Sequence, residues 1–199
     1  MNEAVVLTSE RILEVTEDVL RRYGLAKATV VDVARALDVS HGSVYRHFPS
    51  KVALREAVAN RWLERVSVPL AQITAEPGPA PVKLERWLRE LVDAKCRRVA
   101  DDPEMFATYL ILAREACKVV KAHKEQLTSQ VESILSEGVA QGVFQIDDVK
   151  AAAGAIFDAT SRFHHPAHAD EWKDPARMGR FNAVLTLVLR GVQAAPRSD

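Results

Sequence analysis

Hydrophobic residues recur at intervals of three or four along almost the whole chain, which is the spacing of one buried face of an α-helix. The first such stretch runs from residue 9 to residue 23, with apolar positions at Ile12, Val15, Val19, Leu20 and Tyr23. Gly24 follows it as a typical helix-ending residue. No stretch alternates strictly between apolar and polar residues, as a half-buried strand would. The pattern therefore predicts an all-α protein.

Capping residues predict where the helices of the N-terminal region begin. Thr29 is followed three residues later by Asp32, the spacing of a capping box, so we expect a short helix after Thr29. Ser40 and Ser50 are further N-cap candidates, and they predict a second short helix as far as about His47 and then a longer helix. Two short helices joined by a tight turn form a helix-turn-helix motif.

The stretch AEPGPAP, residues 75–81, contains three prolines and one glycine and cannot continue a helix. We expect it to separate a helix-turn-helix domain at residues 1–55, extended by a linking helix at about 50–75, from a helical domain at 76–199. Five more helices are expected there, at residues 82–100, 103–121, 122–141, 147–163 and 175–192. N-cap aspartates, next to a proline or in a pair, indicate the starts at residues 103, 147 and 175, and Gly142 is a stop signal. The total is about nine helices.

The segment DVSHGSVYRHFPSK, residues 38–51, gathers small polar, basic and aromatic hydrogen-bonding side chains. The second helix of a helix-turn-helix lies in the DNA major groove, with its N-terminal residues against base edges. Gly42 allows a close backbone approach to a duplex, and His41 at the helix tip is placed to reach a base edge. The same segment supplies further hydrogen-bond donors. Ser40 and Ser43 are short donors suited to a phosphate or a base, and the flank, where phosphates lie, holds Tyr45, His47 and Lys51.

The charge of the chain is balanced overall but not locally. Basic and acidic residues are equal in number, 27 of each, so the overall charge does not indicate a polyanionic partner. Residues 21–61, however, hold eight basic side chains and three acidic ones, a net charge of +5. This asymmetry is typical of a segment that binds nucleic acid.

Residues 29–54 resemble the signature of the DNA-binding domain of the TetR family of bacterial transcriptional regulators. The residues that match in register are Thr29, Val33, Ala34, Val39, Ser40, Gly42, Tyr45, His47, Phe48, Ser50, Lys51 and Leu54. Twelve matches form a specific signal, whereas a helix-turn-helix pattern alone is a loose one. The resemblance covers about residues 9–55, and beyond them only helix count and chain length agree.

The resemblance implies roles for individual side chains in binding double-stranded DNA. Phosphate contacts are implied for Thr29, Tyr45, His47 and Lys51, and base contacts for His41, Gly42 and Ser43, with Arg46 as a further candidate. Two residues depart from the family pattern. Asp38 replaces a glycine that is frequent in the turn, and we expect the turn to survive because Asp tolerates a left-handed conformation. His41 replaces Lys, Arg, Pro or Gln, so no base preference carries over. We expect the Tyr45 ring in the core and its hydroxyl on a phosphate.

Dimerisation is expected because one helix-turn-helix reads only a few base pairs, whereas a dimer reads two half-sites. The last two helices are candidates, one with a small-residue face and one apolar over more than one face. The interface residues we predict are Ala152, Ala155, Ala159, Phe181, Leu185 and Val188. The family commonly dimerises through its last two long helices, so the resemblance implies the same homodimer on an inverted-repeat operator. The alternative is that these residues form the core of the domain itself.

A small-molecule effector is the second partner that the resemblance implies. The ligand enters the C-terminal domain, changes the spacing of the two DNA-binding heads and most often releases a repressor from its operator. Candidate lining residues are Trp87, Leu91, Phe106, Tyr109, Arg114, Cys117, Phe157 and Arg162. For each residue taken separately, an ordinary core position is the favoured alternative. The sequence names no ligand, and no cofactor is expected.

The segment FHHPAHADEW, residues 163–172, brings three histidines and two acids close together in sequence. Metal binding by His164, His165 and His168 is an open alternative, but Pro166 interrupts the helix that would align them, and we predict no metal site. An enzyme using this cluster is a second alternative, although no nucleophile, base and oxyanion donor can be assembled from spacing. A helical DNA-binding protein without ligand control is a third. We expect a regulator that is not an enzyme.

Three features predict a cytoplasmic protein. The two cysteines, Cys96 and Cys117, form neither a disulfide framework nor a metal-binding motif. The N-terminus lacks the basic and apolar regions of a signal peptide. No apolar run reaches the length of a membrane span.

Overall fold

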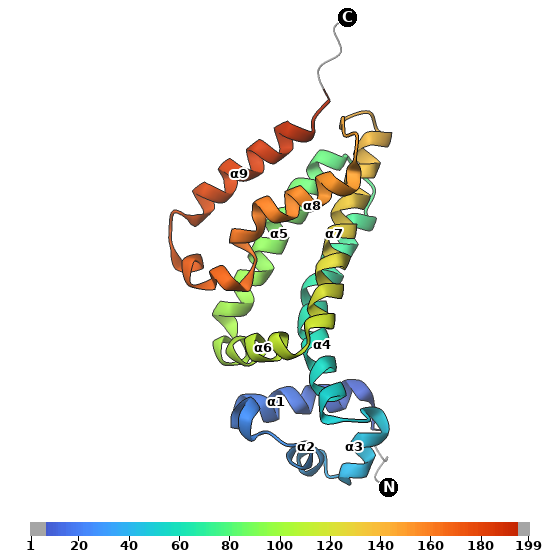
Figure 1. The fold of residues 1–199 in the computed structure, drawn as a ribbon, viewed down its shortest axis with the longest axis vertical. Coiled ribbons are helices and arrows are strands. Elements are labelled where there is room, and N and C mark those ends of the chain that lie inside the picture. Colours follow the sequence, from blue (N-terminus) through green and yellow to red (C-terminus); the bar gives the residue numbers. More distant parts are fainter. Residues whose placement is uncertain (1–6, 195–199) are drawn as a thin grey trace, which may run out of the picture. The chain divides into compact units, whose positions relative to one another are not determined.

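The computed structural model describes residues 7–194, and within them the regular structure is helical (Figure 1). The α-helices are α1 (Ser9–Lys27), α2 (Val30–Ala36), α3 (His41–His47), α4 (Lys51–Ala75), α5 (Ala80–Asp101), α6 (Pro103–Glu115), α7 (Cys117–Ala140), α8 (Val149–Thr160) and α9 (Arg177–Val192). Two 3₁₀ helices, η1 (Ser161–Phe163) and η2 (Pro166–Lys173), connect α8 to α9. The prediction of an all-α protein is confirmed.

The chain divides into two compact units. Unit 1 comprises residues up to 64 together with 102–121, and unit 2 comprises residues 65–101 and those from 122 onward. Helix α6 thus belongs to unit 1, although it follows the Pro-rich linker in the sequence. The predicted domain boundaries at residues 55 and 76 stay a prediction. The structure shows in addition that α6 packs with the N-terminal helices.

Capping interactions define α2 and α3 as the sequence predicts. The hydroxyl of Thr29 accepts a hydrogen bond from the backbone N–H of Asp32 (3.2 Å), and the Asp32 carboxylate accepts one from the backbone N–H of Thr29 (3.0 Å). Ser40 caps α3 by accepting from the N–H of Ser43 (3.1 Å). Asp38, in the turn between them, has a φ of 55°, the left-handed conformation expected of it. The helix-turn-helix is therefore formed by local rules.

The core of unit 1 fixes α2 and α3 against α1 and the first half of α4. Val33 and Val44, one from each short helix, are 2% and 1% exposed. Helix α6 adds Met105 and Tyr109 to the same core, and the Tyr109 ring stacks on Trp62 of α4 with centroids 5.7 Å apart. Each short helix is therefore held by its apolar side, which leaves its polar side exposed.

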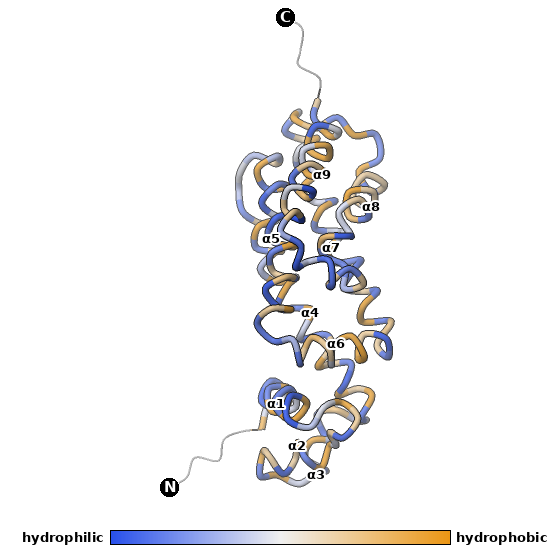
Figure 2. The backbone as a smooth tube through the Cα atoms, turned by 90° about the vertical axis from the view of Figure 1, so that its left-hand side faces the viewer, coloured by the Kyte–Doolittle hydropathy of each residue, from blue (hydrophilic) through white to orange (hydrophobic). Residues whose placement is uncertain are grey.

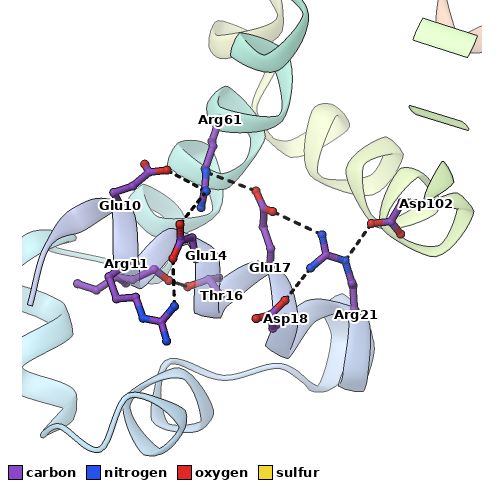
Figure 3. A network of polar contacts seen from close by, with 10 residues as sticks. Glu10, Arg11, Glu14, Thr16, Glu17, Asp18, Arg21, Arg61 and Asp102 are labelled. Atoms are coloured by element: carbon purple, nitrogen blue, oxygen red, sulfur yellow. Dashed lines mark hydrogen bonds and ion pairs between the residues drawn. The ribbon is translucent and has the colours of Figure 1, made fainter. Parts of the chain in front are cut away.

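A polar network ties α4 and α6 to α1 within unit 1 (Figure 3). Arg61 of α4 lies 2.8 Å from the carboxylate of Glu10 and within 4 Å of Glu14 and Glu17. Arg21 of α1 donates to Asp102, the residue before α6 (2.9 Å). Both arginines reach Glu17, whose side chain is only 3% exposed. The network therefore connects the first helix with two helices that are distant in sequence.

The core of unit 2 is built from α5, α7, α8, α9 and the second half of α4. Trp87 of α5 is fully buried, and its indole N–H donates to the side-chain oxygen of Gln130 (2.9 Å). Gln130 in turn donates to the backbone carbonyl of Ser67 (3.1 Å). Gly138 of α7 lets the ring of Phe144 lie directly on the helix backbone, at a place where a Cβ atom would overlap the ring. These contacts satisfy buried polar groups and allow close packing.

Several of the predicted helix boundaries differ in the structure. Helix α1 kinks at Gly24 and runs on to Lys27, whereas the sequence predicts its end at Gly24. The break between α6 and α7 falls at Ala116, earlier than the predicted end near residue 121. Helix α8 ends at Thr160, and residues 161–173 turn into the 3₁₀ helices η1 and η2. Hydrophilic and hydrophobic residues are interspersed along the described helices (Figure 2). None of these helices is both long and apolar enough to cross a membrane.

Candidate functional site

The predicted DNA-contacting residues lie together at α3 and the residues next to it. The side chains of His41, Tyr45, Arg46, His47 and Lys51 are exposed, while Val44 points into the core. Because Val44 anchors α3, its neighbours at the helix N-terminus and along its outer side face away from unit 1. The structure therefore brings these predicted residues to one short helix and its flank.

A chain of hydrogen bonds organises the N-terminal turn of α3. The hydroxyls of Ser40 and Ser43 are 2.9 Å apart. The guanidinium of Arg46 donates to the Ser43 hydroxyl (3.0 Å). The arginine is therefore held along the helix, over its N-terminal half, where a major-groove helix meets base edges.

The aromatic side chains of α3 contact each other or the start of α1. His41 and Tyr45 meet edge to face, with centroids 6.3 Å apart. Tyr45 is 40% exposed, so the expectation that its ring lies in the core is wrong: Val44 occupies the inward position of this turn. His47 is hydrogen-bonded through Nδ1 to the hydroxyl of Ser9 at the start of α1 (3.1 Å). This bond orients the imidazole from outside α3.

Gly42 has no structural requirement within the chain itself. Its φ is not positive, and a Cβ added there would meet only the Ser40 hydroxyl at an ordinary distance of 3.7 Å. The fold of unit 1 would therefore accept a side chain at residue 42. The absence of one leaves the backbone at the tip of α3 uncovered, which matches the expectation of a close approach by a partner.

The local positive charge is smaller than the sequence count indicates. Four of the eight basic residues in 21–61 are engaged in ion pairs within unit 1: Arg21, Arg35, Arg55 and Arg61. Arg46 and Lys51 form no ion pair with any residue between 7 and 194. The other four are divided equally: Arg46 and Lys51 lie at α3 and the first turn of α4, and Arg22 and Lys27 lie on α1.

Thr29 is exposed, but its hydroxyl serves the helix cap. It donates to the carboxylate of Asp32 (2.6 Å) while accepting from the Asp32 backbone. The hydrogen bonds from Thr29 lower the pKa of Asp32, and Arg35 contributes to the same shift. A phosphate contact by Thr29 therefore has to share an oxygen that already caps α2.

The eight predicted ligand-lining residues are divided between the two units. Phe106, Tyr109, Arg114 and Cys117 belong to unit 1, and Trp87, Leu91, Phe157 and Arg162 belong to unit 2. Tyr109 lies in the core of unit 1, where burial raises its pKa to about 12. Arg114 and Cys117 are exposed. Trp87 and Leu91 are fully buried, and Arg162 pairs with Glu171 (2.6 Å). No single unit holds the whole set.

The predicted dimer residues differ in exposure. Phe181 and Leu185 are 0% and 1% exposed and pack in the core of unit 2, so they are not available to a partner surface. Ala155 and Ala159 on α8 are exposed, and Ala152 and Val188 are partly buried. Leu187, one of the residues that make the last helix apolar over more than one face, is 71% exposed. The outward sides of α8 and α9 therefore carry Ala155, Ala159 and Leu187, and not Phe181 and Leu185.

A cluster of basic side chains inside unit 2 was missed from the sequence. The ammonium of Lys95 on α5 lies 3.4 Å from Nε2 of His123 on α7. His164, which follows η1, is 3% exposed, and its Nε2 lies 3.2 Å from the hydroxyl of Thr160. The signal was present: Lys95 follows Trp87 and Leu91 at helical intervals of four, on the face that the core buries.

Burial and mutual repulsion dominate the electrostatics of this cluster. Desolvation, with the nearby charge of Arg98, lowers the pKa of Lys95 to about 8. Desolvation lowers the pKa of His123 to about 3, and the charges of Lys95 and His164 act in the same direction. The pKa of His164 is likewise lowered to about 3, mainly by desolvation and then by Lys95. Both imidazoles are therefore neutral near pH 7.

The remaining histidines of residues 163–172 belong to a separate surface arrangement. Nδ1 of His168 contacts the carboxylate of Glu171 (3.0 Å), which also accepts from Arg162 (2.6 Å). The hydrogen bonds from His168 and Arg162 lower the pKa of Glu171. Across the described part of the chain, no three His, Cys, Asp or Glu side chains are grouped as a metal site requires.

Comparison with protein families gives two matches. A family described as "Bacterial regulatory proteins, tetR family" matches residues 12–58. A family described as "Tetracyclin repressor-like, C-terminal domain" matches residues 80–185, more than half of the chain. The first match contains α2 and α3 with the exposed residues described above.

Individual proteins similar to this chain have low sequence identity to it or match only part of it. The HTH-type transcriptional regulator SAR0097 of Staphylococcus aureus (strain MRSA252) is 30% identical over 97 residues, which are 47% of this chain and 48% of that protein. The match therefore spans about half the length of that relative. A solved TetR-family regulator from Mesorhizobium loti has a TM-score of 0.69 at 16% identity and covers 94% of this chain and 96% of its own.

Two further solved structures share the fold and contain small molecules. FadR from Bacillus subtilis, in complex with stearoyl-CoA, has a TM-score of 0.62 at 18% identity and covers 94% of this chain and 100% of its own. RolR in complex with resorcinol has a TM-score of 0.55 at 18% identity, with coverage of 92% and 86%. At these identities the likeness concerns the fold.

Proposed function

Because the chain belongs to the TetR family of bacterial regulatory proteins, we propose that it is a dimeric repressor that binds operator DNA through α3 and leaves it when a small molecule binds. Transcriptional regulation through a helix-turn-helix is common to the family. The dimer, the repressor role and the release by a ligand are the parts proposed for this chain.

The observation that carries the proposal is the outward side of α3. Arg46 and Lys51 lie there without an acidic partner among residues 7–194, and Gly42 uncovers the backbone at the helix tip. In this reading Arg46, oriented by Ser43, faces base edges, and Lys51 neutralises a phosphate. His41 supplies a further base contact, since it is exposed at the start of α3.

Dimerisation is proposed through the outward side of α8 and α9. A helix-turn-helix dimer places two α3 helices on half-sites about 34–36 Å apart on one face of the duplex. Leu187 is 71% exposed on α9, and the small residues Ala155 and Ala159 lie exposed on α8. Small residues allow helices to approach closely, and an exposed leucine gains free energy when a partner buries it. A two-fold interface of these helices accounts for both features.

Ligand control is proposed for unit 2. FadR and RolR, which share the fold, are described with stearoyl-CoA and with resorcinol, so the fold accommodates chemically different small molecules. In this chain α4 runs from unit 1 into unit 2 as one helix, and Arg61 ties its first half to α1. A ligand that shifts α4 would therefore act on the helices that carry the DNA-binding residues.

Selection of genomic DNA fragments by the purified protein at physiological salt tests this proposal. Sequencing of the retained fragments is expected to return an inverted repeat with two half-sites about one helical turn apart. The genes beside that repeat then suggest the class of effector. Retention of DNA with no enriched sequence would contradict the proposal and indicate a non-specific DNA-binding protein.

A further inference from the structure

Two basic side chains from different helices meet inside unit 2, and a third is near enough to interact with them electrostatically. Lys95 comes from α5, His123 from α7, and His164 from the residue after η1. His123 and His164 are 8% and 3% exposed, and Lys95 is partly buried. Side chains that meet from separate helices are held in place by the fold, so their arrangement is not an accident of one local sequence.

The cluster has no negative charge of its own. Between residues 7 and 194, Lys95 forms no ion pair with a carboxylate, and its polar contact is the imidazole of His123. The charges that reach His123 and His164 come from Lys95, Lys124 and other imidazoles, all of them basic. Asp158, on α8, is paired with the exposed Lys124 (3.2 Å). A partly buried ammonium without an anion is costly, so a negatively charged ligand would stabilise it.

The groups around the basic cluster are apolar. The ring of Phe157 lies 4.7 Å from the imidazole of His164. Leu91 and Leu127 lie one helical turn from Lys95 and His123 on the same buried faces, and both belong to the core of unit 2. A molecule that reaches Lys95 therefore meets a positive charge at one end and apolar side chains beside it.

We propose that Lys95, with His123 beside it, is the recognition site for the carboxylate of the effector, an amphipathic organic monoacid. The ammonium of Lys95 forms the ion pair with the carboxylate. The imidazole of His123, whose Nε2 lies 3.4 Å from that ammonium, orients it. His164 is bonded through Nε2 to the hydroxyl of Thr160 (3.2 Å) and packs beside the ring of Phe157. One cation balances one negative charge, so the site suits a monoanion better than a doubly charged phosphate. Phe157 and the neighbouring leucines contact the apolar body of the acid.

This inference rests on the proposed function, because the bound acid is identified as the effector of a regulator. The contacts that bind the carboxylate do not depend on that role. Binding of the acid is measurable on the protein without DNA. Operator binding, in turn, is measurable without the acid. Failure of one therefore leaves the other standing.

The test is the thermal stability of the purified protein with benzoate, phenylacetate, octanoate and decanoate, each compared with its primary amide at equal concentration. The amide preserves the shape and removes the charge. At least one acid is expected to raise the melting temperature clearly more than its amide does. In Lys95→Met that acid is expected to bind roughly 10- to 100-fold more weakly, as loss of a charge-assisted hydrogen bond implies.

Lys150→Met is the matched control, because it removes an exposed positive charge of unit 2 on α8. It should respond to the acid as the wild type does. The proposal is overturned if no acid stabilises the wild type more than its amide, or if folded Lys95→Met responds as strongly as the wild type.

Discussion

Arg21 and Asp102 lie 81 residues apart in the sequence, yet Nε of the arginine donates to Oδ2 of the aspartate at 2.9 Å. The other oxygen of the same carboxylate, Oδ1, accepts from the backbone N–H of Met105 and caps α6 (3.0 Å). One side chain thus begins α6 and attaches it to α1 (Figure 3). Since α1 also holds α2 and α3 through the core of unit 1, this aspartate connects α6 with the DNA-binding helices.

Replacement of Asp102 separates its two roles. Asp102→Ala loses both the cap and the ion pair and is expected to lower the free energy of unfolding by about 1–3 kcal/mol. Asp102→Asn keeps a good capping oxygen and loses the charge, so a loss of about 1 kcal/mol or less is expected. Urea denaturation of both variants measures the difference. Equal losses would show that the cap contributes nothing measurable.

Gly138 is required by close packing and not by backbone conformation. A Cβ at this position would overlap the ring of Phe144, whereas a Cβ at Gly179 of α9 would meet open space. We expect Gly138→Ala to lower the free energy of unfolding by about 1–3 kcal/mol through overpacking. Gly179→Ala should raise it by about 0.5–1 kcal/mol, because alanine favours the helix. A stable Gly138→Ala protein would contradict the packing described for Phe144.

Lys95 should cost stability at neutral pH. Its pKa in the folded protein is about 8, below the ordinary 10.5, so the unfolded chain binds more protons between these values. Stability from this group therefore increases as the pH rises from 8 to 10.5, and its cost is fully present below pH 8. We expect Lys95→Met to be about 1–3 kcal/mol more stable at pH 7.

The same substitution should remove this contribution to the pH dependence. Urea denaturation between pH 7 and pH 10 compares the wild type with Lys95→Met and with Lys124→Met. The exposed Lys124 should have an effect of about 0.5 kcal/mol or less. A less stable Lys95→Met protein would mean that the ammonium has a stabilising partner. We expect Lys95→Met to be more stable than the wild type and to lose the response to the acid. Both results together would show that Lys95 serves ligand binding at a cost to the stability of the free protein.

Lys51 and His41 should affect DNA binding in different ways. Lys51→Ala is expected to weaken binding to all DNA sequences about equally and to reduce the slope of log affinity against log salt by roughly one. His41→Ala should relax the base preference at one position in each half-site. Titrations over a range of salt concentrations, with repeated fragment selection, distinguish the two. Loss of cognate binding alone in Lys51→Ala would contradict its phosphate role.

Much of unit 1 could be predicted because its signals are local. The capping pair Thr29 and Asp32, the cap at Ser40 and the positive φ of Asp38 are all present as the sequence predicts. Each depends on residues within a few positions of one another. The family resemblance found in residues 29–54 is confirmed by the family match to residues 12–58.

The parts that were missed depend on tertiary packing. The helix break at Ala116 has no proline or glycine beside it to indicate it. Phe181 and Leu185 read equally well as interface or core, and only the position of α9 decides for the core. The pairing of Lys95 with His123 joins residues 28 positions apart on two helices. No local pattern states that these two side chains meet.

The central claim is that the exposed side of α3 reads a symmetric operator as a dimer. The most direct measurement is the affinity and stoichiometry of the purified protein on the selected inverted repeat and on a duplex of equal length with both half-sites scrambled. At physiological salt we expect two chains on the inverted repeat and a loss of roughly a thousandfold or more in affinity on the scrambled duplex. Equal affinity for both duplexes, or one chain on the repeat, would contradict the account.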